Sequence, residues 1–226
     1  SLVRKARESG GLVGLDLVKD VTIDKKYIWA SAKPAAGRSF NVVVIDCGVK
    51  YNILRLLCGK GCRVTVVPAR TSAGEILGLK PDGLMLSNGP GDPAAVDYVV
   101  NTTRSLMEKL PIFGICLGHQ MLGQALGGKT FKLKFGHHGG NHPVKDLRTG
   151  AVSITVQNHG FCVDIDTLNK KDVELTHVNL NDNTLEGLRH KKLPVFSVQF
   201  HPEAAPGPRD ASYLFDDFVK LMSKKR

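Results

Sequence analysis

The sequence contains no long hydrophobic run. No apolar stretch reaches the roughly 18 residues that a membrane-spanning helix needs, so we expect no membrane association. No signal-peptide pattern opens the chain either. Because the sequence starts at Ser1 and not at Met, a targeting segment further upstream is left open.

Cysteines are few and show no pairing pattern. The five cysteines are odd in number and scattered along the chain, which is typical of free thiols in a reducing compartment. We therefore predict a cytoplasmic location, with an organelle as the open alternative. Cys58 and Cys62 lack a second pair of ligands, so we expect no zinc site there.

Aromatic residues make up only 6% of the chain, although the formal net charge is +10. Nucleic-acid-binding surfaces combine clustered basic residues with aromatic side chains. Here the basic residues are dispersed, so we predict no nucleic-acid partner and favour a solvated basic surface or one that faces an acidic protein. The phosphate-binding pattern Gly-x-x-x-x-Gly-Lys-Ser/Thr is also missing, so ATP is not expected to bind this chain.

The 226 residues suffice for the core of one domain with an appendage, and 42% of them are hydrophobic. Apolar runs predict strands at residues 41–46, 63–67, 83–87, 111–115 and 195–200. Helical patterns alternate with them at residues 52–57, 97–110, 121–126 and 210–222. This alternation predicts an α/β fold with an open, mostly parallel twisted sheet and helices on both faces.

Cys116 stands between a predicted buried strand and a predicted helix, in the pattern Gly-Ile-Cys-Leu-Gly of residues 114–118. A side chain on such a sharp turn needs a strained backbone, and the flanking glycines make room for it. The positive end of the helix dipole also favours a thiolate. The pattern therefore predicts a nucleophile, with a small buried apolar cysteine as the alternative.

His201 and Glu203 follow another strand-like run, with Pro202 between them. Proline favours an extended conformation for the preceding residue, and in an extended segment residues two apart point the same way. A carboxylate beside an imidazole can fix its tautomer and stabilise the imidazolium. Together with Cys116, the pair predicts a Cys-His-Glu triad, with a solvated His-Pro turn as the alternative.

Three candidate segments follow three different predicted strands: residues 87–93, Cys116 and His201. In an open α/β sheet, ligands bind beyond the carboxyl ends of the strands, so we expect the three segments to meet in one site. Glycines in residues 87–93 would let backbone N–H groups approach a substrate. A plain tight turn is the alternative for that segment.

These motifs together resemble the class I, or triad, glutamine amidotransferases. The resemblance rests on Ser-Asn-Gly-Pro-Gly-Asp-Pro (87–93), Gly-Ile-Cys-Leu-Gly-His-Gln (114–120) and Gln-Phe-His-Pro-Glu (199–203). Residues 135–143 and 157–161 narrow the resemblance to one family, the small, glutamine-hydrolysing subunits of carbamoyl-phosphate synthetases. The likeness covers nearly the whole chain.

The resemblance implies a role for each motif. The Cys116 thiolate would attack the side-chain amide of L-glutamine, with His201 as general base and Glu203 orienting it. The N–H groups of Gly89 and Leu117 would stabilise the oxyanion. The residues implied to hold glutamine are Gly89, Gly91, Leu117, Gln120, Asn158, Gly160 and Phe161.

The other histidines near these motifs receive different interpretations. His119 is expected to point away from the nucleophilic sulfur, and His159 is likewise not expected to be the base. His137, His138 and His142 lie in a glycine-rich stretch that we interpret as a loop. No carboxylate or cysteine stands at ligand spacing along that stretch, so we predict no metal.

The resemblance also implies a partner. Ammonia would pass to the large, ATP-using subunit of a carbamoyl-phosphate synthetase, in a heterodimer or larger assembly, for arginine and pyrimidine biosynthesis. No cofactor is expected in this chain, and ATP and Mg²⁺ are expected on the partner. Two alternatives stay open: a glutaminase domain that serves GMP or anthranilate synthase, and a non-catalytic structural domain.

Residues 1–38 are interpreted as an interdomain segment and linker, and residues 39–226 as the glutamine amidotransferase domain. The first segment resembles the joint between the two domains of the small subunits named above. The first of those domains, which supplies a serine to the glutamine pocket, has no counterpart here. We therefore expect a fragment or an excised domain whose pocket lacks one wall.

Overall fold

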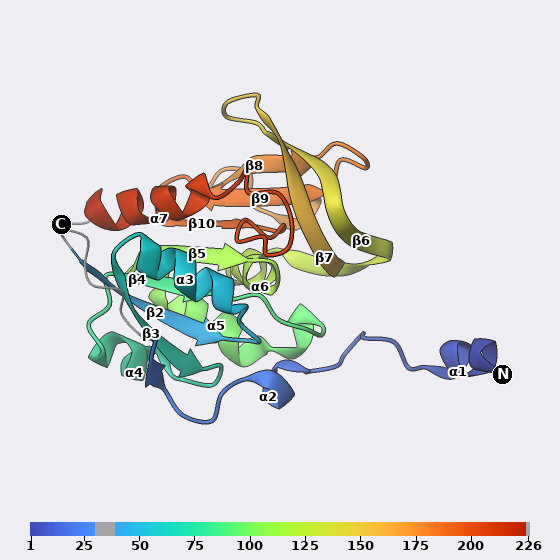
Figure 1. Cartoon of the computed structure of the whole chain (residues 1–226), viewed down its shortest axis with the longest axis horizontal. Coiled ribbons are helices and arrows are strands. Elements are labelled where there is room, and N and C mark those ends of the chain that lie inside the picture. The colour runs from blue at the N-terminus through green and yellow to red at the C-terminus, as the bar shows by residue number, and fades with distance from the viewer. Residues whose placement is uncertain (30–38, 225–226) are drawn as a thin grey trace.

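A single ten-stranded sheet runs through the molecule (Figure 1). The structure is a computed structural model that describes residues 1–29 and 39–224. The strands are β1 (Tyr27–Ile28), β2 (Phe40–Asp46), β3 (Cys62–Pro68), β4 (Gly83–Leu86), β5 (Ile112–Ile115), β6 (Lys129–Asp146), β7 (Val152–Asp164), β8 (Val173–Asn179), β9 (Leu185–His190) and β10 (Val195–Val198). Their order across the sheet is β1-β3-β2-β4-β5-β10-β9-β8-β6-β7.

The sheet has a parallel half and an antiparallel half. Strands β3, β2, β4, β5 and β10 run parallel to one another, with β1 as an antiparallel edge. Beyond β10, the strands β9, β8, β6 and β7 all pair antiparallel. The predicted open α/β sheet is confirmed, but "mostly parallel" holds only for the first half. In the second half, the pairs β10–β9, β9–β8 and β6–β7 each join consecutive strands by a short connection, which allows only antiparallel pairing.

Helices cover both faces of the parallel half, whereas the first helix, α1 (Leu2–Glu8), lies apart from the sheet at the N-terminal end (Figure 1). The others are α2 (Val18–Val21), α3 (Tyr51–Gly59), α4 (Ala73–Gly78), α5 (Asp97–Leu106), α6 (Leu117–Ala125) and α7 (Tyr213–Lys224), with short 3₁₀ turns η1 (Pro93–Ala95) and η2 (Ile165–Thr167). Successive side chains of β2 point to opposite faces. Val42 and Val44 belong to the core under α3 and α7, whereas Val43 and Ile45 belong to the core under α4, α5 and α6.

The stretch interpreted as a loop, residues 135–143, is instead part of strand β6, and that prediction was wrong. The strand pairs with β7 along most of its length, with register shifts between Lys132 and His137 and between Gly139 and His142. Gly136 and Gly139 have φ values of 76° and 131°, a region that favours glycine. The glycines therefore form bulges inside a strand.

The N-terminal segment packs against the turn that follows β4. The Gly14 N–H donates to the Asp92 carboxylate (2.8 Å), and the Asp92 N–H donates to the Leu15 carbonyl (3.0 Å). Most of the predicted linker, residues 30–38, lies outside the described residues, and the predicted domain boundary at residue 39 stays a prediction. None of the helices among the described residues has the length and apolar character needed to cross a bilayer.

Candidate active site

Cys116 occupies a strained turn between β5 and α6. Its backbone has φ 55° and ψ −104°, in the left-handed half of conformational space that side chains rarely adopt. A Cβ added to Gly114 would lie 2.6 Å from the Gly118 carbonyl oxygen, and one added to Gly118 would collide with the Leu86 carbonyl. The predicted strained turn with space-making glycines is confirmed.

His201 and Glu203 follow β10, the strand beside β5, and they interact directly. His201 Nδ1 donates to Glu203 Oε1 at 2.7 Å, and both side chains are buried. The Asn52 amide donates to the Glu203 carbonyl oxygen. The predicted sharing of one side by residues 201 and 203 is therefore found, and Glu203 fixes the imidazole orientation.

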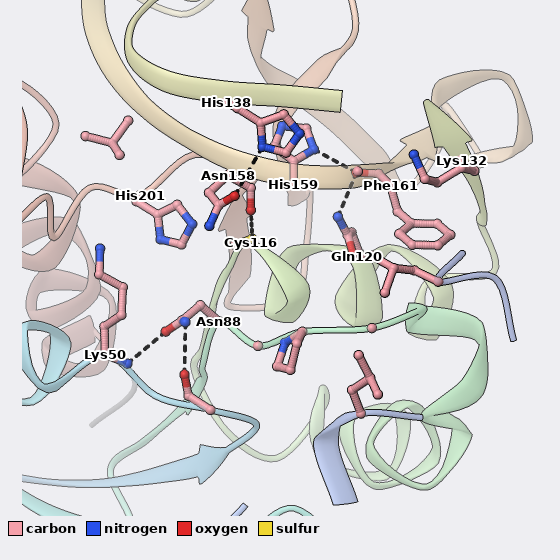
Figure 2. A pocket seen from close by; sticks show the side chains of 18 of the residues that line it. Lys50, Asn88, Cys116, Gln120, Lys132, His138, Asn158, His159, Phe161 and His201 are labelled. Atoms are coloured by element: carbon pink, nitrogen blue, oxygen red, sulfur yellow. Dashed lines mark hydrogen bonds between the residues drawn. The ribbon is translucent and has the colours of Figure 1, made fainter. Parts of the chain in front are cut away.

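The charge of His201 depends on Cys116. Burial alone would lower the pKa of His201, but the Cys116 sulfur and the Glu203 carboxylate together raise it to about 10. The imidazole of His201 thus lies between the sulfur and the carboxylate, and both favour its protonated form. Cys116 Sγ also lies 3.9 Å from the Asn158 carbonyl oxygen, on the facing strand β7 (Figure 2).

A pocket of about 640 Å³ opens above the Cys116 sulfur (Figure 2). Cys116 and His201 line it together with six of the seven residues predicted to bind substrate: Gly89, Gly91, Gln120, Asn158, Gly160 and Phe161. Leu117 and Glu203 are not among the lining residues. The structure thus brings together segments from four separate parts of the chain: the three that the strand ends predict, and residues 158–161 from within β7.

The glycines of residues 87–93 allow close backbone contacts. A Cβ at Gly89 would collide with the Cys47 carbonyl oxygen, so only glycine fits between that strand end and the pocket. Gly91 has φ 94°, and a Cβ there would lie 2.7 Å from the Leu15 carbonyl oxygen of the N-terminal segment. The interpretation as a plain turn does not account for these approaches.

Gln120 fixes the opposite wall of the pocket. Its amide nitrogen donates to the Phe161 carbonyl (2.8 Å) and to the Gln199 side-chain oxygen (3.0 Å). Both amide hydrogens are therefore engaged by the protein. Through these contacts the amide nitrogen of Gln120 holds the Phe161 carbonyl in place (Figure 2).

The two excluded histidines are both engaged elsewhere. His119 is fully buried and its Nδ1 lies 2.8 Å from the Ser197 hydroxyl, and burial lowers its pKa to about 3. The prediction that it points away from the sulfur agrees with this contact. His159 Nδ1 lies 2.8 Å from the Phe161 carbonyl oxygen, and burial lowers the pKa of this imidazole to about 4.

Two carboxylates that sequence spacing did not indicate lie close to the histidines of β6. His137 Nε2 lies 2.9 Å from Asp182 Oδ2, and His137 Nδ1 lies 3.6 Å from Glu186 Oε1. Within the described residues, His137, His159 and Glu186 form the one group of three possible ligands close enough to share an ion. Protein groups already contact all three side chains. That no metal binds here stays a prediction.

Sequence reasoning missed Lys50, which lines the pocket. Its Nζ lies 3.0 Å from Glu203 Oε1 and donates to the Ala204 carbonyl at 2.8 Å. The Asn88 side chain accepts from the Lys50 N–H (3.0 Å) and donates to the Gly48 carbonyl (3.0 Å). A signal existed, because Lys50 follows the carboxyl end of β2, where site residues are expected.

A strained cysteine on a strand-to-helix turn, beside a His-Glu pair from the neighbouring strand, defines a class of protein. Residues 43–221 match the model of the family "Glutamine amidotransferase class-I". This match covers more than half of the chain, and the chain therefore belongs to that family.

Among curated relatives, the chain is similar to carbamoyl phosphate synthase small chains. It is 58% identical to that of Fusobacterium nucleatum over 97% of this chain and 66% of the relative. It is 52% identical to the chloroplastic one of Oryza sativa over 95% of this chain and 50% of the relative. The chain thus spans about half to two thirds of the length of these relatives.

Solved structures share the fold. A putative GMP synthase component from Thermoplasma acidophilum has a TM-score of 0.72 at 22% identity, covering 84% of this chain and 97% of the other. A glutamine amidotransferase of Thermotoga maritima has a TM-score of 0.60 at 17% identity, covering 84% and 86%. At these identities the likeness concerns the fold alone.

Proposed function

We propose that this chain hydrolyses L-glutamine and supplies the ammonia to the large subunit of a carbamoyl-phosphate synthetase. The observation that carries the proposal is the arrangement of Cys116 on its strained turn, with His201 and Glu203 on the adjacent strand end. The small-chain names of relatives at 52% to 58% identity support the choice of synthetase.

The reaction begins with attack of the Cys116 sulfur on the side-chain amide carbon of glutamine. The N–H groups of Gly89 and Leu117 stabilise the tetrahedral oxyanion, and loss of one such donor typically costs about 3–4 kcal/mol. His201 then donates its proton to the leaving ammonia, which leaves a glutamyl thioester on Cys116. Neutral His201 activates the water that hydrolyses this thioester to glutamate.

The pocket residues divide the remaining work. Gly91 and Gln120, together with Asn158, Gly160 and Phe161 on β7, hold the α-amino and carboxylate ends of glutamine. The hydrogen bond from His201 lowers the pKa of Glu203, and Lys50, whose ammonium lies 3.0 Å from the Glu203 carboxylate, lowers it further and holds the carboxylate in position. These roles follow from the position of each residue around one pocket of about 640 Å³.

The partner would use ATP and Mg²⁺, and this chain would need no cofactor for the chemistry of its triad. Assembly with the large subunit, as a heterodimer or larger complex, would place ammonia where it is consumed. The cytoplasm is the proposed location, and an organelle is the alternative, because the rice relative is named chloroplastic.

The test measures glutamate release by the chain alone and with a carbamoyl-phosphate synthetase large subunit. We expect slow hydrolysis by the chain alone, because the pocket is open to water, and a rise in kcat/KM of at least tenfold, about 1.4 kcal/mol, on adding the partner. Full activity unchanged by the partner would instead identify a self-sufficient amidohydrolase. A rise only with the partner subunits of GMP synthase or anthranilate synthase would reassign the partner.

A further inference from the structure

We call residues 157–161 of β7 the pocket wall. A buried polar cluster lies directly behind it. It joins Glu186 on β9 to His137 on β6 and to His159 on the wall itself. The triad chemistry described above uses none of these three side chains. All three are nevertheless buried, and Glu186 is 0% exposed.

Glu186 has the hydrogen-bond pattern of an ionised carboxylate. The Gln157 amide donates to Oε2 (2.9 Å), and the Asn179 amide donates to Oε1 (2.9 Å). Both oxygens therefore act as acceptors. A fully buried anion needs a compensating cation nearby. Among the described residues, the cationic group within 4 Å of Glu186 is the imidazole of His137.

The hydrogen bonds of the two imidazoles require one proton more than two neutral rings carry. His137 Nε2 faces the Asp182 carboxylate at 2.9 Å, and His159 Nδ1 faces the Phe161 carbonyl at 2.8 Å. Both contacts need an N–H donor. The other two ring nitrogens face each other at 3.2 Å and need a third proton between them.

The Gln157 side chain reinforces this count. Its amide nitrogen is committed to Glu186, so its oxygen, 2.9 Å from His159 Nε2, accepts the shared proton whenever that proton lies on His159. Two neutral histidines bring two ring protons, and the contacts call for three. The His137–His159 pair therefore carries one shared extra proton and a single positive charge.

The electrostatic environment agrees with one shared proton. The contact with Glu186 is the largest cause that raises the pKa of His137, and it outweighs burial. Burial lowers the pKa of His159, so the second ring resists a further proton. The pair thus accepts one positive charge but not two.

We propose that Glu186 and His137 are positioning residues of the glutamine pocket, which act through a buried ion pair between the carboxylate and the His137–His159 pair. This rests on the proposed function. Because the shared proton occupies the space between the two facing nitrogens, His159 keeps its own proton on Nδ1, which donates to the Phe161 carbonyl, the same oxygen that Gln120 contacts. The ion pair thereby fixes the backbone that holds the ends of glutamine.

The test combines a proton count with steady-state kinetics. ¹⁵N NMR of the histidine side chains at pH 7 should find three ring protons on the His137–His159 pair in the wild-type chain. Glu186→Gln should reduce the count to two and raise KM for glutamine at least tenfold, with kcat changed less than threefold. When His137→Gln is combined with Glu186→Gln, KM for glutamine should rise less than twofold above that of Glu186→Gln alone, because the two residues act as one unit.

The matched control is Glu174→Gln. Glu174 also lies in the antiparallel half and pairs with a cation, Arg189, at 2.8 Å, but on a partly exposed face. The KM of the Glu174→Gln variant for glutamine should stay within twofold of the wild-type value. An unchanged KM in Glu186→Gln, two neutral rings in the wild type, or one bound zinc ion per chain by elemental analysis would each overturn the proposal. A chain without glutaminase activity would refute the proposed function, while the NMR count would still decide the ion pair.

Discussion

The two halves of the sheet contribute different things to one pocket. The parallel half supplies the reacting groups, because Cys116, Lys50 and the 87–93 turn all follow the carboxyl ends of its strands. The antiparallel half supplies a wall, residues 157–161, in the middle of a long strand. On the proposed function, reactivity thus comes from strand ends, where backbone strain is tolerated. Substrate binding then comes from a continuous strand, which the proposed ion pair holds from behind.

This contrast predicts that changes in the parallel half reduce the rate of the chemical step, whereas changes behind the wall weaken glutamine binding. Variants of the parallel half test the first part of this contrast, and the largest effect is expected at Cys116.

Cys116→Ser should remove the nucleophile without disturbing the fold. We expect glutamine hydrolysis to fall at least about 10³-fold, because an alkoxide is far harder to generate than a thiolate. Glutamate release measures the rate, and circular dichroism verifies the fold. Near-normal activity would place the nucleophile elsewhere.

His201→Asn should reduce hydrolysis by about 10² to 10⁴-fold, the usual range for a lost general acid-base residue. The control is His119→Asn, a histidine of similar burial that contacts Ser197 and not Cys116. The rate of glutamine hydrolysis in this control should fall less than about tenfold, because the substitution affects only the stability of the fold. Equal losses in the two variants would overturn the assignment of the base.

Lys50→Met should lower kcat/KM about tenfold, or 1.4 kcal/mol, because Glu203 would lose its ion pair and orient His201 less well. Lys60→Met is a matched control: Lys60 pairs with Asp216 at 2.7 Å, and its side chain is 35% exposed against 33% for Lys50. Steady-state kinetics should show no change in that control. Equal kinetics in both variants would show that Lys50 does not support Glu203 in catalysis.

The pH profile should show the smallest effect. A pKa raised to about 10 means that His201 keeps its proton below about pH 10 and loses it above that value. We therefore expect kcat/KM to change less than about twofold between pH 7 and 9 and to fall above pH 10. A fall that begins near 6.5, the ordinary value for imidazole, would show that the sulfur does not hold the proton on His201.

The parallel half was predictable from the sequence because its strands are continuous apolar runs. β2 and β5 are buried on both faces, and turns with Gly114 and Gly118 mark the site. The same rule about strand ends could have found Lys50, but no motif pointed to it.

The antiparallel half was less predictable. β6 carries glycines at bulges and exposed polar side chains, so its composition suggests a loop, and only pairing with β7 makes it a strand. β8 and β9 were not anticipated. His137 has two carboxylate partners, Asp182 and Glu186, which lie 45 and 49 positions further along the chain. Local ligand spacing therefore gave no indication of them.

The most direct measurement traps the intermediate. The chain is mixed with labelled glutamine in the presence of a large synthetase subunit, quenched with acid and analysed by peptide mass spectrometry. We predict a glutamyl thioester on Cys116, at most one per chain, that is absent from Cys116→Ser and accumulates when His201 is replaced by a residue too weak to activate water. Glutamate formation at the full rate with no label on Cys116 would contradict the account.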